Sequence, residues 1–307
     1  MANGPQPNSD DTIHFDSGLL TDTEGLHLVA RKITSGSLAG LHRSPRRGAS
    51  IEFSEHKLYT PGDDVRHIDW RAFAKTDRLH VKQFEDETNL RIELLCDHSG
   101  SMGFRGSHEL SKLEYAKTLA ASLALLGLAQ GDAVGLQTFT SILSHQIPAR
   151  SRSSHLLELL THIASLQPSG TTDVSGCLEE FAQTRRRPAV TILLTDLFEP
   201  TKLYLEVIRG LIARRHDIAV LHILAPDEID FPYENPAQFE CMEADRRMFI
   251  HPRAFRSMYV HAMQEHLMQV HDDMTALGVD YRLIKTNQPP REALAQFLRE
   301  RATHSLR

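Results

Sequence analysis

Cysteine is scarce in this sequence, and its three copies lie far apart. Cys96, Cys177 and Cys241 show no paired spacing, which excludes a disulfide framework and a zinc site built on paired cysteines, so we expect reduced thiols. Long apolar runs are also missing: none approaches the roughly 18 residues that span a bilayer, and no signal-peptide pattern opens the chain. We therefore expect a soluble, cytoplasmic protein without a transmembrane segment.

Excess positive charge is absent as well. Lys and Arg total 34 against 40 Asp and Glu, which gives a net charge of −6, and no long basic block is present. This balance argues against nucleic acid as the main partner. The 18 histidines do not show the spacing of a zinc-binding helix, so we expect them to be scattered over the surface.

The first part of the chain divides into a tail and a small appendage. Residues 1–25 are rich in Pro, Gly, Asn and Asp, and this composition predicts a flexible tail. Residues 26–88 are predicted to form an N-terminal appendage with a short helix at 26–32 and short strands, one of them at 79–84. A turn is expected at Pro61-Gly62-Asp63.

Charged residues crowd around Trp70, the only tryptophan, in this appendage. Arg66 or Arg71 could be held by a nearby aspartate in a buried ion pair. A structural role is favoured there over a catalytic one, because carboxylates neutralised by arginine make poor acids and bases.

Residues 89–307 alternate between apolar runs and amphipathic segments. Strands are expected at 90–96, 132–139, 142–147, 189–196, 217–224 and 279–284, and helices at 110–129, 154–166, 174–184, 203–215, 255–277 and 290–301. This alternation predicts an α/β fold with a doubly wound, mostly parallel sheet flanked by helices. The second and third strands are joined too closely for a crossover and should be antiparallel. The acidic, Pro-interrupted segment near 227–250 is predicted as an insertion with a strand pair.

Oxygen-bearing side chains follow the first buried strand of this region. Asp97, Ser99 and Ser101 alternate along Asp97-His-Ser-Gly-Ser101, directly after the strand. A carboxylate and two hydroxyls are hard donors that suit Mg²⁺ or Mn²⁺ better than zinc. The pattern therefore predicts part of a metal-binding loop.

A second buried strand, at 189–196, also ends in an aspartate, Asp196, and a Thr-bearing loop at 168–173 lies between the two strands in sequence. The carboxyl ends of parallel strands meet at one edge of a sheet, so these oxygens should come together. Capping of helix 174–184 by Thr172 or Asp173 is a compatible alternative use of the loop.

These three parts together resemble the metal-ion-dependent adhesion site, or MIDAS, of von Willebrand factor A domains. The resemblance implies that Asp97, Ser99, Ser101, Thr172 and Asp196 hold the ion directly or through water, and it selects Thr172 over Thr171 because Asp173 follows it. It covers roughly residues 89–285.

The segment before the metal loop resembles domain of unknown function family 58, a family of bacterial proteins that carry such an A-like domain. The matching residues are Glu52-Phe53, His56-Lys-Leu-Tyr59, Pro61-Gly-Asp-Asp64, Arg66, Ile68-Asp-Trp70 and Leu79-His-Val-Lys82. The chain departs from the family at Lys57, where an arginine is usual. The resemblance implies a link with MoxR-type AAA+ ATPases, which makes such an ATPase an expected partner.

Three functions are compatible with the sequence. The favoured one is a non-catalytic, metal-dependent protein-binding module in which a partner's carboxylate completes the shell of Mg²⁺ or Mn²⁺. The first alternative is a magnesium-dependent phosphohydrolase with Asp97 as nucleophile, but the second aspartate of such enzymes is replaced by Ser99, and neither a nucleophile elbow nor a phosphate loop is present. The second alternative is a metal-free scaffold.

Overall fold

A single mixed sheet forms the body of the protein. The computed structural model describes residues 20–34, 51–58, 80–86, 90–185 and 187–304. The sheet has six strands in the order β10 (Asp280–Lys285), β7 (Asp217–Leu224), β6 (Val190–Thr195), β3 (Arg91–Asp97), β4 (Ala133–Phe139) and β5 (Leu143–Arg150). Neighbouring strands are parallel except β5, which is antiparallel to β4. The predicted doubly wound α/β fold class, with β3 and β6 at the centre, is confirmed.

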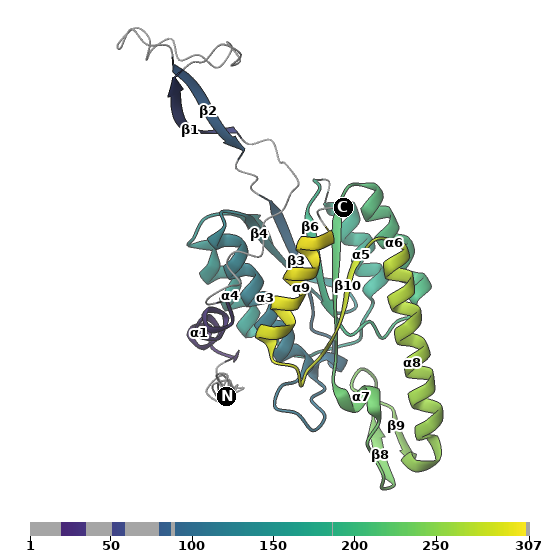
Figure 1. Cartoon of the computed structure of the whole chain (residues 1–307). Helices are drawn as coiled ribbons and strands as arrows, with labels where there is room; N and C mark the ends of the chain where they lie inside the picture. Colours follow the sequence, from purple (N-terminus) through teal and green to yellow (C-terminus); the bar gives the residue numbers. More distant parts are fainter. Residues whose placement is uncertain (1–19, 35–50, 59–79, 87–89, 186, 305–307) are drawn as a thin grey trace, which may run out of the picture.

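Helices cover both faces of this sheet (Figure 1). One apolar core joins the sheet to α1 (Thr23–Thr34), α3 (Lys112–Ala129), α4 (His155–Ser165) and α9 (Pro290–His304). The other joins it to α5 (Val174–Thr184), α6 (Thr201–Ala213) and α8 (Pro252–Ala276). Side chains of β3 alternate between the two, with Leu94 in the first core and Leu95 in the second, as the two-residue period of a strand requires. Burial on both faces explains why the middle of β3, from Leu94 to Cys96, is an unbroken apolar run.

Helix α3 packs across the sheet and is buried along most of its length. It begins at a capping box in which the Ser111 hydroxyl accepts from the backbone N–H of Glu114, and the Glu114 carboxylate accepts from the N–H of Ser111. Its small and apolar residues fit this position, but two lysines, Lys112 and Lys117, are buried as well. Each of them must therefore have a polar partner inside the protein.

Strand β5 is a polar edge strand. Its side chains alternate only weakly in burial: Ile147 is buried, whereas the positions from Ser144 to Gln146, and Pro148, are exposed. Its pairing with β4 is interrupted by register shifts. The predicted antiparallel neighbour at 142–147 is confirmed.

At the N-terminal side, β1 (Ile51–Leu58) and β2 (His80–Asp86) form a separate antiparallel pair. The predicted strand at 79–84 corresponds to β2, and the predicted helix at 26–32 corresponds to α1. Helix α1 lies against α3 and α4 and shares their apolar core. The turn at Pro61-Gly62-Asp63 and the charged residues around Trp70 fall outside the described residues.

The insertion near 227–250 contains α7 (Pro226–Asp230) and an antiparallel hairpin of β8 (Ala237–Glu240) and β9 (Arg247–Ile250). The predicted strand pair is confirmed, whereas the short helix α7 was not predicted. The rings of Phe231, Tyr233 and Phe239 pack on one another at the base of the hairpin. This aromatic contact attaches the hairpin to the body beside α7.

The cysteines, the histidines and the helix lengths were also the subject of predictions. All three cysteines are free; Cys96 and Cys177 are buried and Cys241 is exposed. Not all histidines are on the surface, because His155 and His222 are buried with both ring nitrogens hydrogen-bonded, which offsets the cost of burial. In the parts of the chain that are described, no helix has both the length and the apolar character needed to cross a membrane.

Candidate metal centre

Asp97 ends β3 beside the end of β6 and is fully buried. One carboxylate oxygen, Oδ1, accepts from the backbone N–H of Ser99 at 2.9 Å. The other, Oδ2, accepts from the hydroxyl of Thr195, the last residue of β6, at 2.7 Å. Both oxygens are therefore held in place by the first residues of the loop and by the neighbouring strand.

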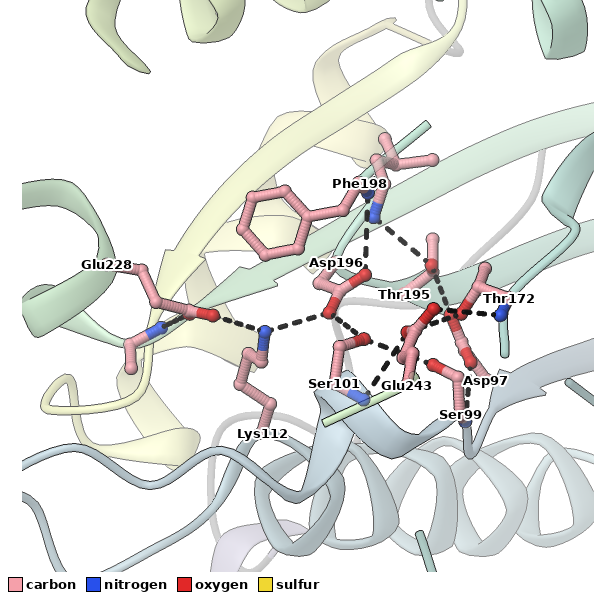
Figure 2. A network of polar contacts seen from close by, with 12 residues as sticks. Asp97, Ser99, Ser101, Lys112, Thr172, Thr195, Asp196, Phe198, Glu228 and Glu243 are labelled. Carbon is pink, nitrogen blue, oxygen red and sulfur yellow. Dashed lines mark hydrogen bonds and ion pairs between the residues drawn. The ribbon is translucent and has the colours of Figure 1, made fainter. Parts of the chain in front are cut away.

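The loop after Asp97 turns through a short 3-10 helix, Gly100–Gly103, and its hydroxyls meet the end of β6. The Oγ atoms of Ser99 and Ser101 are 3.2 Å apart, and Ser101 Oγ donates to Asp196 Oδ2 at 2.6 Å. Figure 2 shows these side chains pointing toward one another from the two strand ends. Four of the five predicted ligands, Asp97, Ser99, Ser101 and Asp196, are thus joined in one hydrogen-bonded cluster.

The fifth predicted ligand, Thr172, reaches the same cluster from the loop before α5. The loop is held against the first one because Gly100 N–H donates to Gly170 O at 3.0 Å and Ser169 N–H donates to His98 O at 2.9 Å. Thr172 is partly buried whereas Thr171 is exposed, which agrees with the choice between them.

The capping alternative for this loop belongs to the next residue, Asp173. Its carboxylate accepts from Gly176 N–H at 2.8 Å and caps α5. Because Asp173 caps α5, the Thr172 hydroxyl is not needed for capping and remains available to the cluster.

A buried lysine at the site was not predicted. Lys112 Nζ lies 2.8 Å from Asp196 Oδ2 and 2.5 Å from Glu228 Oε1, and its side chain has no exposed surface. The ring of Phe198 lies on the ammonium group, 4.8 Å from ring centroid to Nζ. A lysine in the first turn of an apolar helix was the only signal in the sequence, and its two partners are 84 and 116 residues further along the chain.

The two aspartates of the site have opposite electrostatic environments. Burial and the charge of Asp196 raise the pKa of Asp97 to about 7. Burial also opposes ionisation of Asp196, but the Lys112 ammonium outweighs it and lowers the pKa of that carboxyl. The Asp196 and Glu228 carboxylates in turn outweigh burial and raise the pKa of Lys112. The charge of Asp196 is therefore neutralised by Lys112, whereas no cationic side chain in the described part of the chain does the same for Asp97.

Glu243, in the connection between β8 and β9, was also missed. Its Oε1 accepts from Thr172 Oγ1 at 3.2 Å and from Ser101 N–H at 3.4 Å, and its Oε2 accepts from Thr172 N–H at 3.1 Å. No sequence pattern marks Glu243, because its position depends on how the hairpin folds back over the loops. It is the direct link between Thr172 and the rest of the cluster (Figure 2).

The donor set fits a hard divalent cation. Neighbouring ligands in an octahedral shell of radius 2.0–2.1 Å are about 2.9 Å apart. The contacts from Ser101 to Ser99 and to Asp196, at 3.2 and 2.6 Å, bracket that spacing. Among the described residues no group of three His, Cys, Asp or Glu side chains suits a metal, as expected of a site whose donors are mainly hydroxyls. The residues present therefore suit Mg²⁺ or Mn²⁺ rather than zinc.

An open pocket of about 340 Å³ adjoins the cluster. It is lined by Ser101, Phe104, Phe198, Glu228, Cys241, Met242 and Glu243. Its lining thus includes Ser101, a predicted ligand, and three residues of the connection between β8 and β9. An acidic group entering this pocket would reach the cluster next to Ser101.

Comparison with known sequences places relatives over nearly the whole chain. The family model described as "Protein of unknown function DUF58" matches residues 55–269. The uncharacterized protein Rv1480 of Mycobacterium tuberculosis is 26% identical over 296 residues, which are 95% of this chain and 92% of that protein.

Solved structures with a similar arrangement include the conserved hypothetical protein BatB from Bacteroides thetaiotaomicron, at 16% identity and a TM-score of 0.44, over 70% of this chain and 99% of that one. They also include the vWF domain of the pili tip protein Mfa5 from Porphyromonas gingivalis, at 11% identity and a TM-score of 0.34, over 70% of this chain and 94% of that one.

Proposed function

This chain belongs to the DUF58 family, and we propose that it is a divalent-metal-dependent protein-binding module without catalytic activity. One observation carries the proposal: oxygen side chains of the loop after β3 and of Asp196 meet at the ends of β3 and β6, at spacings that suit an octahedral ion, and Glu243 joins Thr172 to them. The carboxylate of Glu243 against Thr172 supports it further, because the site already accommodates an acidic group.

In this proposal Asp97, Ser99, Ser101, Thr172 and Asp196 hold Mg²⁺ or Mn²⁺ directly or through water. The bound ion supplies a Lewis-acidic position for a carboxylate of another protein. The chain's own part is orientation: Thr195 fixes the Asp97 carboxylate and Lys112 keeps Asp196 charged.

The proposed partner is a MoxR-type AAA+ ATPase or a client of such a system, for which this protein would be an accessory or adaptor. Support comes from the DUF58 family resemblance. The site itself adds only that the partner should offer a carboxylate.

Calorimetric titration with Mg²⁺ and Mn²⁺ tests the metal site. Asp97→Ala should abolish binding, because it removes the carboxylate at the centre of the cluster. Asp132→Ala is the matched control, since Asp132 is also a buried aspartate beside a strand of the same sheet, but it accepts from Leu90 N–H and has no contact with the cluster. Equal titrations for wild type and Asp97→Ala would remove the proposal.

Partner binding is tested at constant magnesium, because chelation would also strip the metal from the nucleotide of an ATPase. A MoxR-type ATPase immobilised with its nucleotide should retain wild type and Asp132→Ala but not Asp97→Ala. Retention of all three would contradict a role of the metal in partner recognition.

A metal-free scaffold is the second candidate, and Lys112 is the observation that favours it. Its ammonium already neutralises Asp196 from inside the protein, as a bound cation would. A phosphohydrolase is less compatible with the geometry, since both oxygens of Asp97 accept hydrogen bonds and the side chain has no exposed surface from which to attack a substrate.

A further inference from the structure

The connection between β8 and β9 covers the candidate metal centre. Its residues Cys241, Met242 and Glu243 form one side of the pocket beside Ser101. Figure 2 shows the Glu243 carboxylate among the side chains of the site, between Thr172 and Ser101. The insertion therefore contributes a residue to a site otherwise built from the sheet edge.

The backbone of the connection also fits closely against the metal loop. A Cβ atom at Gly100 would lie 2.2 Å from the carbonyl oxygen of Met242, so only glycine allows this approach. The Met242 methyl group likewise lies near Gly103, 3.3 Å from where a Cβ would be. The connection is thus seated on the loop through both its main chain and the Glu243 side chain.

The residues that bind Glu243 are two of the predicted metal ligands. Two of its three donors belong to Thr172, and the third is the backbone N–H of Ser101. Carboxylate oxygens are preferred ligands of Mg²⁺ and Mn²⁺, and the Glu243 carboxylate accepts from the Thr172 hydroxyl, one of the predicted ligand atoms. Glu243 therefore lies against two of the residues that are predicted to hold the ion.

We propose that Glu243 is a further, displaceable ligand of the metal ion, which fills the coordination position that a partner's carboxylate takes over. This inference rests on the proposed function and describes the metal site as it is before a partner protein binds. The hairpin is suited to being displaced, because its connection is largely exposed and, among the strands that the structure describes, β8 and β9 pair only with each other. The aromatic contact among Phe231, Tyr233 and Phe239 would remain as its hinge.

Manganese binding and water-proton relaxation test this assignment. Glu243→Ala should weaken Mn²⁺ binding roughly tenfold, the lower end of the loss caused by removing a group that supports a metal site. It should also raise the relaxivity of the bound Mn²⁺, because a water molecule replaces the lost carboxylate. Millimolar acetate should lower that relaxivity again in Glu243→Ala and leave wild type unchanged.

Asp245→Ala is the matched control, since it removes the same charge from an exposed position two residues further along the connection. It should behave as wild type in affinity, relaxivity and response to acetate. Circular dichroism of each variant verifies that the sheet is intact.

The results of these measurements distinguish a failure of this inference from a failure of the proposed function. If wild type binds no Mn²⁺, the proposed function and the inference fail together. If wild type binds Mn²⁺, Asp97→Ala does not, and Glu243→Ala has the relaxivity of wild type, the metal site stands and Glu243 is not its ligand. If Glu243→Ala binds Mn²⁺ more weakly but shows neither a higher relaxivity nor a response to acetate, Glu243 has only a structural role. That result would also overturn the inference.

Discussion

The ammonium nitrogen of Lys112 and the Oδ2 atom of Asp196 are 2.8 Å apart and fully screened from solvent. Lys112 of helix α3 thereby places a positive charge next to Asp196, on the side of the candidate metal centre away from Asp97 (Figure 2). Asp196 is neutralised in this way whether or not an ion is present, whereas Asp97 depends on one. Four predictions follow from this asymmetry and from the contacts around it.

Replacing Lys112 by methionine should destabilise the protein by about 3 kcal/mol or more in chelator, because Asp196 and Glu228 would lose their buried counter-charge. Magnesium should then raise the melting temperature of the variant more than that of wild type. The control is Lys117→Met on the same helix, since Lys117 is also buried but donates to the Ala164 carbonyl rather than to an acid. Equal responses to magnesium would contradict the prediction.

The contribution of Asp97 to the stability of the metal-free protein should decrease as pH rises from about 4 to 7. The folded state raises the pKa of Asp97 to about 7, so it binds a proton that the unfolded chain releases at lower pH. The loss should reach about 4 kcal/mol at most, at roughly 1.4 kcal/mol per pKa unit. Denaturant unfolding in chelator should show a flatter profile for Asp97→Asn than for wild type.

Saturating magnesium should remove most of that loss in wild type and should not affect Asp97→Asn. Asp132→Asn should keep the magnesium response, because Asp132 lies outside the cluster. A wild-type profile that is unchanged by magnesium would count against Asp97 as a metal ligand.

Buried His222 should contribute the opposite trend over nearly the same pH range. Burial lowers the pKa of His222 to about 4, so the folded state resists a proton that the unfolded chain accepts near pH 6.5. Its contribution to stability should fall by up to about 3 kcal/mol between those values as pH decreases. His222→Gln should reduce this slope, and His261→Gln, at an exposed position, should not. Identical slopes for all three proteins would be inconsistent with the burial of His222.

Alanine at Gly100 should release the β8–β9 connection, because its Cβ would collide with the carbonyl of Met242. Trypsin should then cleave after Arg246 or Arg247 several times faster than in wild type. Gly210→Ala is the control: nothing lies within 4 Å of its Cβ, and this helical substitution should stabilise the protein by roughly 0.5–1 kcal/mol. Unchanged cleavage in Gly100→Ala would mean that the connection is not held by the loop.

The local features of the site could be predicted from the sequence, and its long-range contacts could not. Asp97 and Asp196 were placed correctly at one edge of the sheet, because the carboxyl ends of parallel strands meet there; that their strands are neighbours is seen only in the structure. Their role as ligands remains a prediction. Lys112 and Glu243 were not predicted as part of the site. From the sequence, a lysine on a helix and a glutamate in a polar loop are both expected to be solvent-exposed, because their partners lie far away along the chain.

The hairpin illustrates the same limit. Its two strands were predicted from the local pattern. The position of their connection over the metal loop depends instead on contacts between residues 142 positions apart in the sequence, which are those of Gly100 with Met242 and of Ser101 with Glu243. No periodicity within the insertion carries that information.

Strand β5 determines which part of the surface is left for recognition. An exposed sheet edge can bind another protein by adding one of its strands, provided that a continuous row of backbone donors and acceptors is presented. Pro148 lacks an N–H, and the register shifts of β5 break the row further. This edge therefore discourages strand addition and self-association through β5.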